Sequence, residues 1–191
     1  MECALVSELP EDSDWTYEVK LDGYRAIGVK TSSETVLYSR NHKNFNKRFP
    51  QIAEALGDLP ADTVIDGEVV ALDESGRPDF HRLQHFTAEP SRLHYFVFDL
   101  LILKGHDLTQ LTLTERRKLL KSIKLRSGRI RISEQFDISA ADMLSAVRQQ
   151  QLEGIVAKVR RGKAHGLLGE DANQQGSGIR NRWLHAGSAR S

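Results

Sequence analysis

The chain has little of several features that would assign its class directly. It holds one cysteine among 191 residues, Cys3, which excludes an internal disulfide and a cysteine-based zinc site. No apolar stretch approaches the roughly 20 residues that cross a bilayer. The acidic N-terminal segment also lacks the basic start and apolar core of a signal peptide. These absences favour a reducing, cytoplasmic setting without a membrane partner.

An excess of one charge is also missing. The formal net charge is +1, so no global basic field marks the chain as a nucleic-acid binder. Nucleic-acid binding would need a local basic face, and residues 40–48 and 160–163 could each supply one. Taken alone, either segment is more typical of a solvated surface. The apolar content of 39% and the chain length are those of one ordinary domain with a real core.

Hydrophobic patterning predicts short strands with helices inserted between them. The predicted strands cover residues 15–20, 26–30, 35–39, 63–72, 93–103, 129–135 and 154–159, and the predicted helices cover 49–56, 80–86, 113–123 and 140–151. Strands and helices do not alternate one for one, and several strands adjoin through hairpin connections. The pattern therefore favours an α+β fold with largely antiparallel sheets over a doubly wound parallel sheet.

Local signals refine this picture at three places. Asp22 and Gly23 are typical of a turn between two strands, and Gly57 is placed to cap the helix before it. From about Lys163 the chain is rich in Gly, Asn, Gln and Ser and has few apolar anchors. We therefore expect one domain over residues 1–163, and a tail over 164–191 that is loop or partly disordered.

Lys20 is the first candidate for chemistry. It ends a predicted strand just before the predicted turn, within residues 20–25, KLDGYR. A lysine that attacks phosphorus must be an uncharged amine, so neighbouring cations or desolvation must lower its pKa. Arg25 could supply the positive field, and Asp22 could orient the amine. By itself Lys-x-Asp-Gly is a weak signal, because a surface lysine beside a hairpin is the commoner interpretation.

Further polar groups follow at the ends of successive predicted strands. They lie in residues 39–41 (SRN), 66–70 (DGEVV), 95–99 (YFVFD) and 153–158 (EGIVAK). A nucleotide site needs an aromatic ring for the base, carboxylates for ribose and metal, and cations for phosphates. Single members also have ordinary structural interpretations, such as Phe98 in the core or Glu18 in cross-strand pairing. His81, His85 and His94 are too scattered for a zinc site.

In order and spacing these segments resemble the nucleotidyltransferase motifs of ATP-dependent DNA ligases, above all the bacterial end-joining type. RNA ligases and mRNA capping enzymes belong to the same superfamily. The resemblance covers residues 4–159. It implies an ATP-grasp-like α+β domain, with largely antiparallel sheets flanked by helices and the nucleotide cleft between them. It also implies ATP and Mg²⁺ or Mn²⁺ as cofactors, and nicked double-stranded DNA and other DNA-repair proteins as partners.

The resemblance also assigns roles. Lys20 takes AMP from ATP as a phosphoramidate and passes it to the 5′-phosphate of a nicked strand, which the 3′-hydroxyl then seals in DNA repair, recombination or replication. Glu18 accepts from the adenine amino group, and Phe98 stacks on adenine. Arg25 and Arg40 contact ribose and phosphates, and Lys158 neutralises the α-phosphate. The implied nucleotide-binding residues are Glu18, Val19, Lys20, Arg25, Arg40, Glu68, Phe98, Ile155 and Lys158, and the implied metal ligands are Glu68 and Glu153.

Two departures from the family keep alternatives open. After residue 163 we expect no OB-fold domain, which these ligases normally carry and which helps to grip DNA. The family's last motif is a tryptophan followed by two lysines at alternate positions. Here the alternate positions after Trp183 hold His185 and Gly187. The alternatives are a degenerate domain that binds nucleotide or DNA without catalysis, and an RNA ligase-type nucleotidyltransferase.

Overall fold

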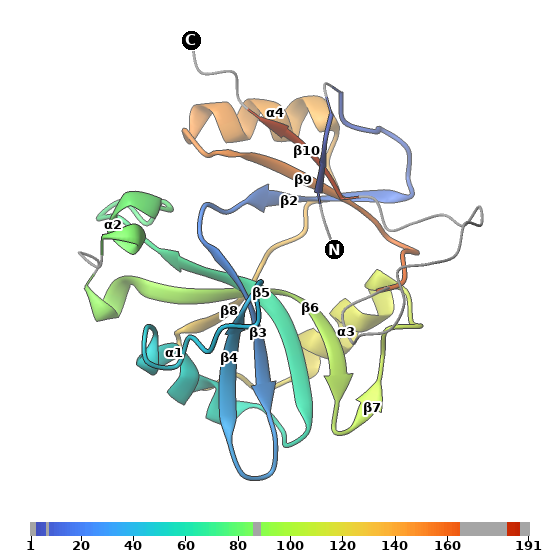
Figure 1. The fold of residues 1–191 in the computed structure, drawn as a ribbon. Coiled ribbons are helices and arrows are strands. Elements are labelled where there is room, and N and C mark those ends of the chain that lie inside the picture. The colour runs from blue at the N-terminus through green and yellow to red at the C-terminus, as the bar shows by residue number, and fades with distance from the viewer. Residues whose placement is uncertain (1–2, 7, 86–88, 165–182, 188–191) are drawn as a thin grey trace. The chain divides into compact units, whose positions relative to one another are not determined.

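The computed structural model describes residues 3–6, 8–85, 89–164 and 183–187 (Figure 1). The chain divides into two compact units. Unit 1 comprises residues 1–20, 109–115 and 134–191, and unit 2 comprises residues 21–108 and 116–133. The predicted α+β fold is confirmed, because paired strands run antiparallel except for two parallel pairs, β1 with β10 and β6 with β8. Within the described residues, no helix has the length and apolarity to cross a membrane.

Unit 1 contains a four-stranded sheet and one helix. The strands lie in the order β1 (Cys3–Leu5), β10 (Trp183–Gly187), β9 (Gly154–Val159) and β2 (Trp15–Lys20), and the helix is α4 (Ala140–Gln149). The Ser139 hydroxyl caps α4 by accepting from the backbone N–H of Asp142. β10 lies inside the predicted tail and forms a strand there. Residues 165–182 and 188–191 of that tail fall outside the described part of the chain.

The period-two alternation of β2 and β9 separates a core face from a polar face in unit 1. Tyr17, Ile155 and Ala157 pack with Met143 and Val147 of α4 in one apolar cluster. The alternate residues of both strands therefore lie on the opposite face of the sheet. That face carries Thr16, Glu18, Lys20 and Lys158.

Unit 2 is built on a larger sheet. Its strands run in the order β4 (Thr35–Ser39), β3 (Tyr24–Lys30), β5 (Thr63–Ala71), β6 (Leu93–Leu103) and β7 (His106–Asp107), and β8 (Ile130–Ile132) also pairs with β6. The remaining helices are α1 (Pro50–Ala55), η1 (Leu56–Asp58), α2 (Phe80–Gln84), η2 (Pro90–Arg92) and α3 (Leu113–Ser122), of which α3 begins in the unit 1 segment.

Tyr95 organises the centre of the unit 2 sheet. Its hydroxyl donates to the backbone oxygens of Ala26 at 2.7 Å and Ile65 at 3.3 Å. Complete burial raises the pKa of this phenol well above its usual value. Gly67 admits the ring, because a Cβ there would lie 2.7 Å from Cε2 of Tyr95.

The structure corrects two local predictions. The Asp22–Gly23 connection is not a hairpin turn, since β2 pairs with β9 and β3 pairs with β4 and β5. Gly23 is required for close approach instead: a Cβ there would overlap the Val69 carbonyl oxygen and lie 2.9 Å from Cγ of Glu68. Gly57 does not cap α1, because the chain continues at Leu56 into the 3₁₀ turn η1.

Candidate functional site

Strand register places the predicted catalytic lysine and its neighbours on one face of unit 1. In the antiparallel β2–β9 pair, Thr16 lies opposite Lys158, Glu18 opposite Val156, and Lys20 opposite Gly154. Directly opposed residues point to the same side of a sheet. Glu18, Lys20 and Lys158 therefore share the polar face, and Glu153 immediately precedes β9 beside Lys20.

Two lysine–glutamate pairs neutralise this face. The Lys158 ammonium lies 2.7 Å from Oε2 of Glu18, and these side chains are only 2% and 3% exposed. Lys20 pairs with Oε1 of Glu153, and both of those side chains are partly exposed. A buried charge is tolerated only with a close partner. The pairing therefore lets the sheet keep a buried ammonium at Lys158 while Lys20 stays accessible.

Glu153 also meets a requirement for a metal ligand. Its Oε1 atom faces Lys20, whereas Oε2 is buried and has no hydrogen-bond partner among the described residues. A carboxylate oxygen in this state suits a hard divalent cation. In the described part of the chain, no group of three or more His, Cys, Asp or Glu side chains forms a closed metal site. Mg²⁺ or Mn²⁺ held by Glu153 would therefore complete its coordination with phosphate oxygens and water, as Mg²⁺ commonly does.

The predicted residues of unit 2 converge around Arg25. Its guanidinium donates to both carboxylate oxygens of Asp66, at 3.1 Å from Nε and 2.6 Å from Nη2. The Arg25 Cζ atom also lies 5.7 Å from the centroid of the Phe98 ring, within cation–π range. Glu68 lies directly opposite Arg25 in the β3–β5 pair. Arg25, Glu68 and Phe98 are thus brought together within unit 2.

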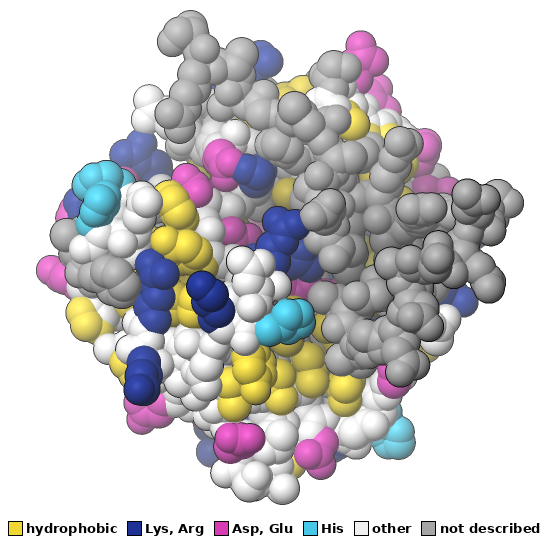
Figure 2. All heavy atoms as spheres, in the orientation of Figure 1, with side chains coloured by type: hydrophobic (Ala, Val, Ile, Leu, Met, Phe, Trp, Pro, Cys, Tyr) yellow, Lys and Arg dark blue, Asp and Glu magenta, His cyan; other side chains and the backbone are white. Residues whose placement is uncertain are grey.

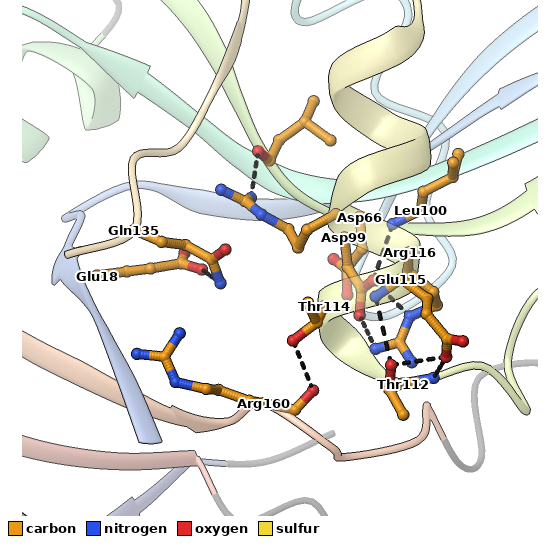
Figure 3. A network of polar contacts seen from close by, with 12 residues as sticks. Glu18, Asp66, Asp99, Leu100, Thr112, Thr114, Glu115, Arg116, Gln135 and Arg160 are labelled. Atoms are coloured by element: carbon orange, nitrogen blue, oxygen red, sulfur yellow. Dashed lines mark hydrogen bonds and ion pairs between the residues drawn. The ribbon is translucent and has the colours of Figure 1, made fainter. Parts of the chain in front are cut away.

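Two further acidic residues of unit 2 bind arginine side chains in this region. The sequence motifs did not predict this role for either residue. Asp66 is fully buried and orients Arg25. Asp99, its cross-strand neighbour, receives bidentate hydrogen bonds from Arg116 at 2.7 and 2.8 Å (Figure 3). Arg116 lies in α3, and no local sequence signal indicates its buried partner 17 positions away.

The basic segment at residues 40–48 is exposed at several positions. Arg40, Lys43 and Lys47 have exposed side chains, and Figure 2 shows Lys and Arg side chains gathered over the α1 and β4 part of unit 2. Arg48 instead stacks on Tyr24, with Cζ 4.3 Å from the ring centroid. Arg40 therefore lies just beyond β4 on an open surface and could reach a ligand only from there.

Val19 and Ile155 differ from the other predicted nucleotide-binding residues. Ile155 is fully buried in the core cluster of unit 1, and Val19 packs against that cluster. Their side chains lie on the core face of the sheet, opposite to Glu18 and Lys20. A contact from either residue to a nucleotide would have to come from its backbone.

Comparison with known proteins identifies the class to which this arrangement belongs. The model of the ATP-dependent DNA ligase domain family matches residues 4–164. The match covers most of the chain, and the chain belongs to this family.

Individual relatives agree with the family. The chain is 36% identical over 171 residues to the multifunctional non-homologous end joining protein LigD of Pseudomonas aeruginosa, covering 86% of this chain and 20% of that protein. The DNA ligase-like protein LigB from the SPbeta prophage of Bacillus subtilis is 30% identical over 156 residues, covering 80% of this chain and 57% of LigB. The chain therefore spans about a fifth of the LigD relative and just over half of LigB.

A solved structure supports the fold. The structure of mycobacterial DNA ligase D complexed with ATP and MES superposes with a TM-score of 0.73 at 26% identity. The match covers 97% of this chain and 60% of that chain. The fold is therefore that of an ATP-dependent ligase nucleotidyltransferase domain.

Proposed function

We propose that this chain transfers AMP from ATP to Lys20 and then to a 5′-phosphate of nicked DNA, as the adenylating part of an ATP-dependent DNA ligase. The observation that carries the proposal is the polar face of unit 1, where an accessible lysine and a buried lysine lie on neighbouring strands, each with its own glutamate. The family membership and a relative solved with ATP support it.

The first step forms a bond between Nζ of Lys20 and the α-phosphorus of ATP and breaks the bond to the pyrophosphate oxygen. Lys20 must be a free amine to attack, and Glu153, whose Oε1 lies against Nζ, holds the amine in place and can receive its proton. The buried Lys158 ammonium would offset negative charge on the α-phosphate, since electrostatic stabilisation dominates such transfers. A divalent cation bound at Glu153 would supply further shielding of that phosphate.

The unit 2 residues would bind the rest of the nucleotide. Phe98 would stack on adenine, and Glu68 would bind the ribose or help to hold the cation. Arg25 is preoriented by Asp66, so that it needs little reorganisation to contact ribose or phosphate. Arg40, from its exposed position, would contact phosphate.

In the later steps AMP passes from Lys20 to the DNA 5′-phosphate, and the 3′-hydroxyl displaces AMP to seal the strand. The end-joining relatives support a role in DNA break repair, with other repair proteins as partners. The motif resemblance puts His185 and Gly187 of β10 at the two positions where the family has lysines. We therefore expect adenylation to be the step that this chain supports best.

The test is self-labelling with α-³²P-ATP and Mg²⁺. We expect an acid-labile covalent label on the wild-type chain and a fall to below about one-thousandth in Lys20→Ala, because the nucleophile is lost. Lys163→Ala, which removes an exposed lysine from the same unit, is the matched control and should label normally.

Each alternative predicts a different result. ATP binding by calorimetry without any label, and without AMP bound after purification, would show a non-catalytic nucleotide-binding domain. Label that survives in Lys20→Ala would show that another residue is the nucleophile. Faster transfer of AMP to nicked RNA than to nicked DNA would reassign the chain as an RNA ligase-type enzyme.

A further inference from the structure

An additional segment extends the β2 edge of the unit 1 sheet. Tyr17 and Phe136 form an antiparallel bridge. The backbone nitrogen of Tyr17 lies 3.2 Å from the carbonyl oxygen of Phe136, and the nitrogen of Phe136 lies 2.8 Å from the carbonyl oxygen of Tyr17. Antiparallel pairing at this bridge puts Gln135 opposite Glu18 and Asp137 opposite Thr16. The Thr16 hydroxyl donates to Asp137 at 3.2 Å, as this register requires.

Gln135 therefore lies on the polar face of the sheet, next to the residue proposed to read adenine. Its Nε2 donates to Oε1 of Glu18 at 3.4 Å, while Oε2 of Glu18 pairs with Lys158. Figure 3 shows the amide end of Gln135 lying against the carboxylate of Glu18. Glu18 is thus held from two sides, and its carboxylate orientation is set by Gln135 and Lys158 together.

One of the two N–H groups of the Gln135 amide donates to Glu18, and the oxygens of both side chains act as acceptors. Each carboxylate oxygen has two lone pairs, so Oε1 of Glu18 can accept a further hydrogen bond while Gln135 donates to it. With its amino group turned to Glu18, the Gln135 amide presents its own oxygen as a second acceptor. An exocyclic amino group, which carries two N–H donors, matches two adjacent acceptors.

We propose that Gln135 is a specificity-determining residue for adenine, acting with Glu18 as a two-acceptor site for the 6-amino group. This inference rests on the proposed function, because it requires a nucleotide base at Glu18. Guanine carries an oxygen at position 6, which cannot donate a hydrogen bond to either acceptor. A site built to hydrogen-bond one group rejects an analogue that lacks it far more strongly than a merely shaped pocket does.

The test removes the hydrogen-bonding groups of Gln135 in one arm and the 6-amino group of the nucleotide in the other. Gln135→Met keeps the side-chain length and removes both hydrogen-bonding groups. Purine riboside triphosphate keeps the purine and removes the 6-amino group. For Lys20 labelling we expect Gln135→Met to lower kcat/KM with ATP about fivefold, the value of one hydrogen bond, through KM and not kcat. With purine riboside triphosphate the variant should equal the wild type, and its preference for ATP over GTP should fall by a similar factor.

Gln149→Met, at the exposed end of α4, is the matched control and should change none of these values. The unchanged rate with the purine analogue also shows that Gln135→Met is folded. Equal losses with ATP and the analogue would mean that Gln135 only ties residues 134–137 to β2, and would overturn the proposal. An unchanged KM for ATP would overturn it as well.

Failure of the proposed function gives a separate result. In a Lys20→Ala background no transfer to Lys20 occurs. Calorimetry can there compare how Gln135→Met changes the dissociation constants of ATP and of purine riboside triphosphate. If the wild type does not label but Gln135→Met weakens ATP binding selectively, the catalytic proposal fails and the assignment of Gln135 stands. If neither nucleotide binds, both proposals are wrong.

Discussion

Buried carboxylates of this chain are paired with basic side chains. Glu18 pairs with Lys158, Asp66 with Arg25, and Asp99 with Arg116. Glu18 and Asp66 belong to the proposed site, where a fixed charge has to be held without water. The Asp99–Arg116 pair is the most deeply buried of the three, with side-chain exposures of 0% and 1%. Variants of this pair therefore measure how much such pairing contributes to stability.

Removing one member of that pair should be costly. We expect Asp99→Asn to lower the free energy of unfolding by about 3–5 kcal/mol, because the Arg116 guanidinium stays buried with weaker compensation. The double variant Asp99→Leu with Arg116→Met should recover much of this loss, since both charges are then gone. Urea denaturation measures both. The single variants Asp99→Leu and Arg116→Met are measured in the same way. If the double variant loses as much stability as these two single variants lose together, the explanation is contradicted.

His94 should make stability depend on pH. Burial, and secondarily Arg131, lower the pKa of its imidazole in the folded chain. The folded state therefore disfavours the charged form, so the free energy of unfolding should fall as pH drops below about 6.5, the unfolded value. Denaturation between pH 8 and 5 should show a slope that His94→Leu reduces. His106→Gln, at an exposed position on β7, should retain the wild-type slope.

At the scale of elements, two neighbouring strands carry the proposed chemistry of unit 1. β2 and β9 pair over six residues from Trp15–Val159 to Lys20–Gly154. A one-residue slip would exchange the core face and the polar face. The packing of Tyr17, Ile155 and Ala157 against α4 therefore also determines that Glu18, Lys20 and Lys158 point away from the core.

The start of β3 depends on Gly23. A Cβ at this position would overlap the Val69 carbonyl oxygen, so β3 would have to move away from β5. We expect Gly23→Ala to destabilise the chain by about 1–3 kcal/mol, as overpacking does, and to slow Lys20 labelling. Gly57→Ala is the control, because no atom of the described residues lies within 4 Å of its Cβ position. Equal stability of the two variants in denaturant would refute the role given to Gly23.

At the scale of the whole molecule, the net charge is +1, so the proposed DNA binding would have to depend on local basic surface. The exposed Lys43 and Lys47 supply such a surface in unit 2. We expect their double replacement by alanine to weaken binding of nicked DNA. It should also reduce the slope of log affinity against log salt by about 2, because each phosphate that a lysine neutralises adds roughly 0.9 to that slope.

Lys118→Ala with Lys121→Ala removes two exposed cations from α3 and is the matched control for charge. Fluorescence anisotropy over a range of salt concentrations measures both double variants. An equal change in slope for the two would show that net charge, and not the location of Lys43 and Lys47, governs binding.

Local sequence patterns determined the elements and the family. The strands at Trp15–Lys20, Leu93–Leu103 and Gly154–Val159 were predicted with their observed bounds, because alternation and continuous apolar runs are properties of adjacent residues. The ordered motifs likewise indicated the ligase family from short segments. The roles of the site residues stay predictions until the labelling experiments are done.

Only the tertiary structure decided which side chains meet. Gln135 lies beside Glu18, 117 positions away, and Arg116 beside Asp99, because of strand register and helix packing. β10 likewise lies in the sheet between β1 and β9, where composition predicted only a tail. Pairings of this kind depend on hydrogen bonds and burial between distant segments, and a pattern of neighbouring residues carries no information about them.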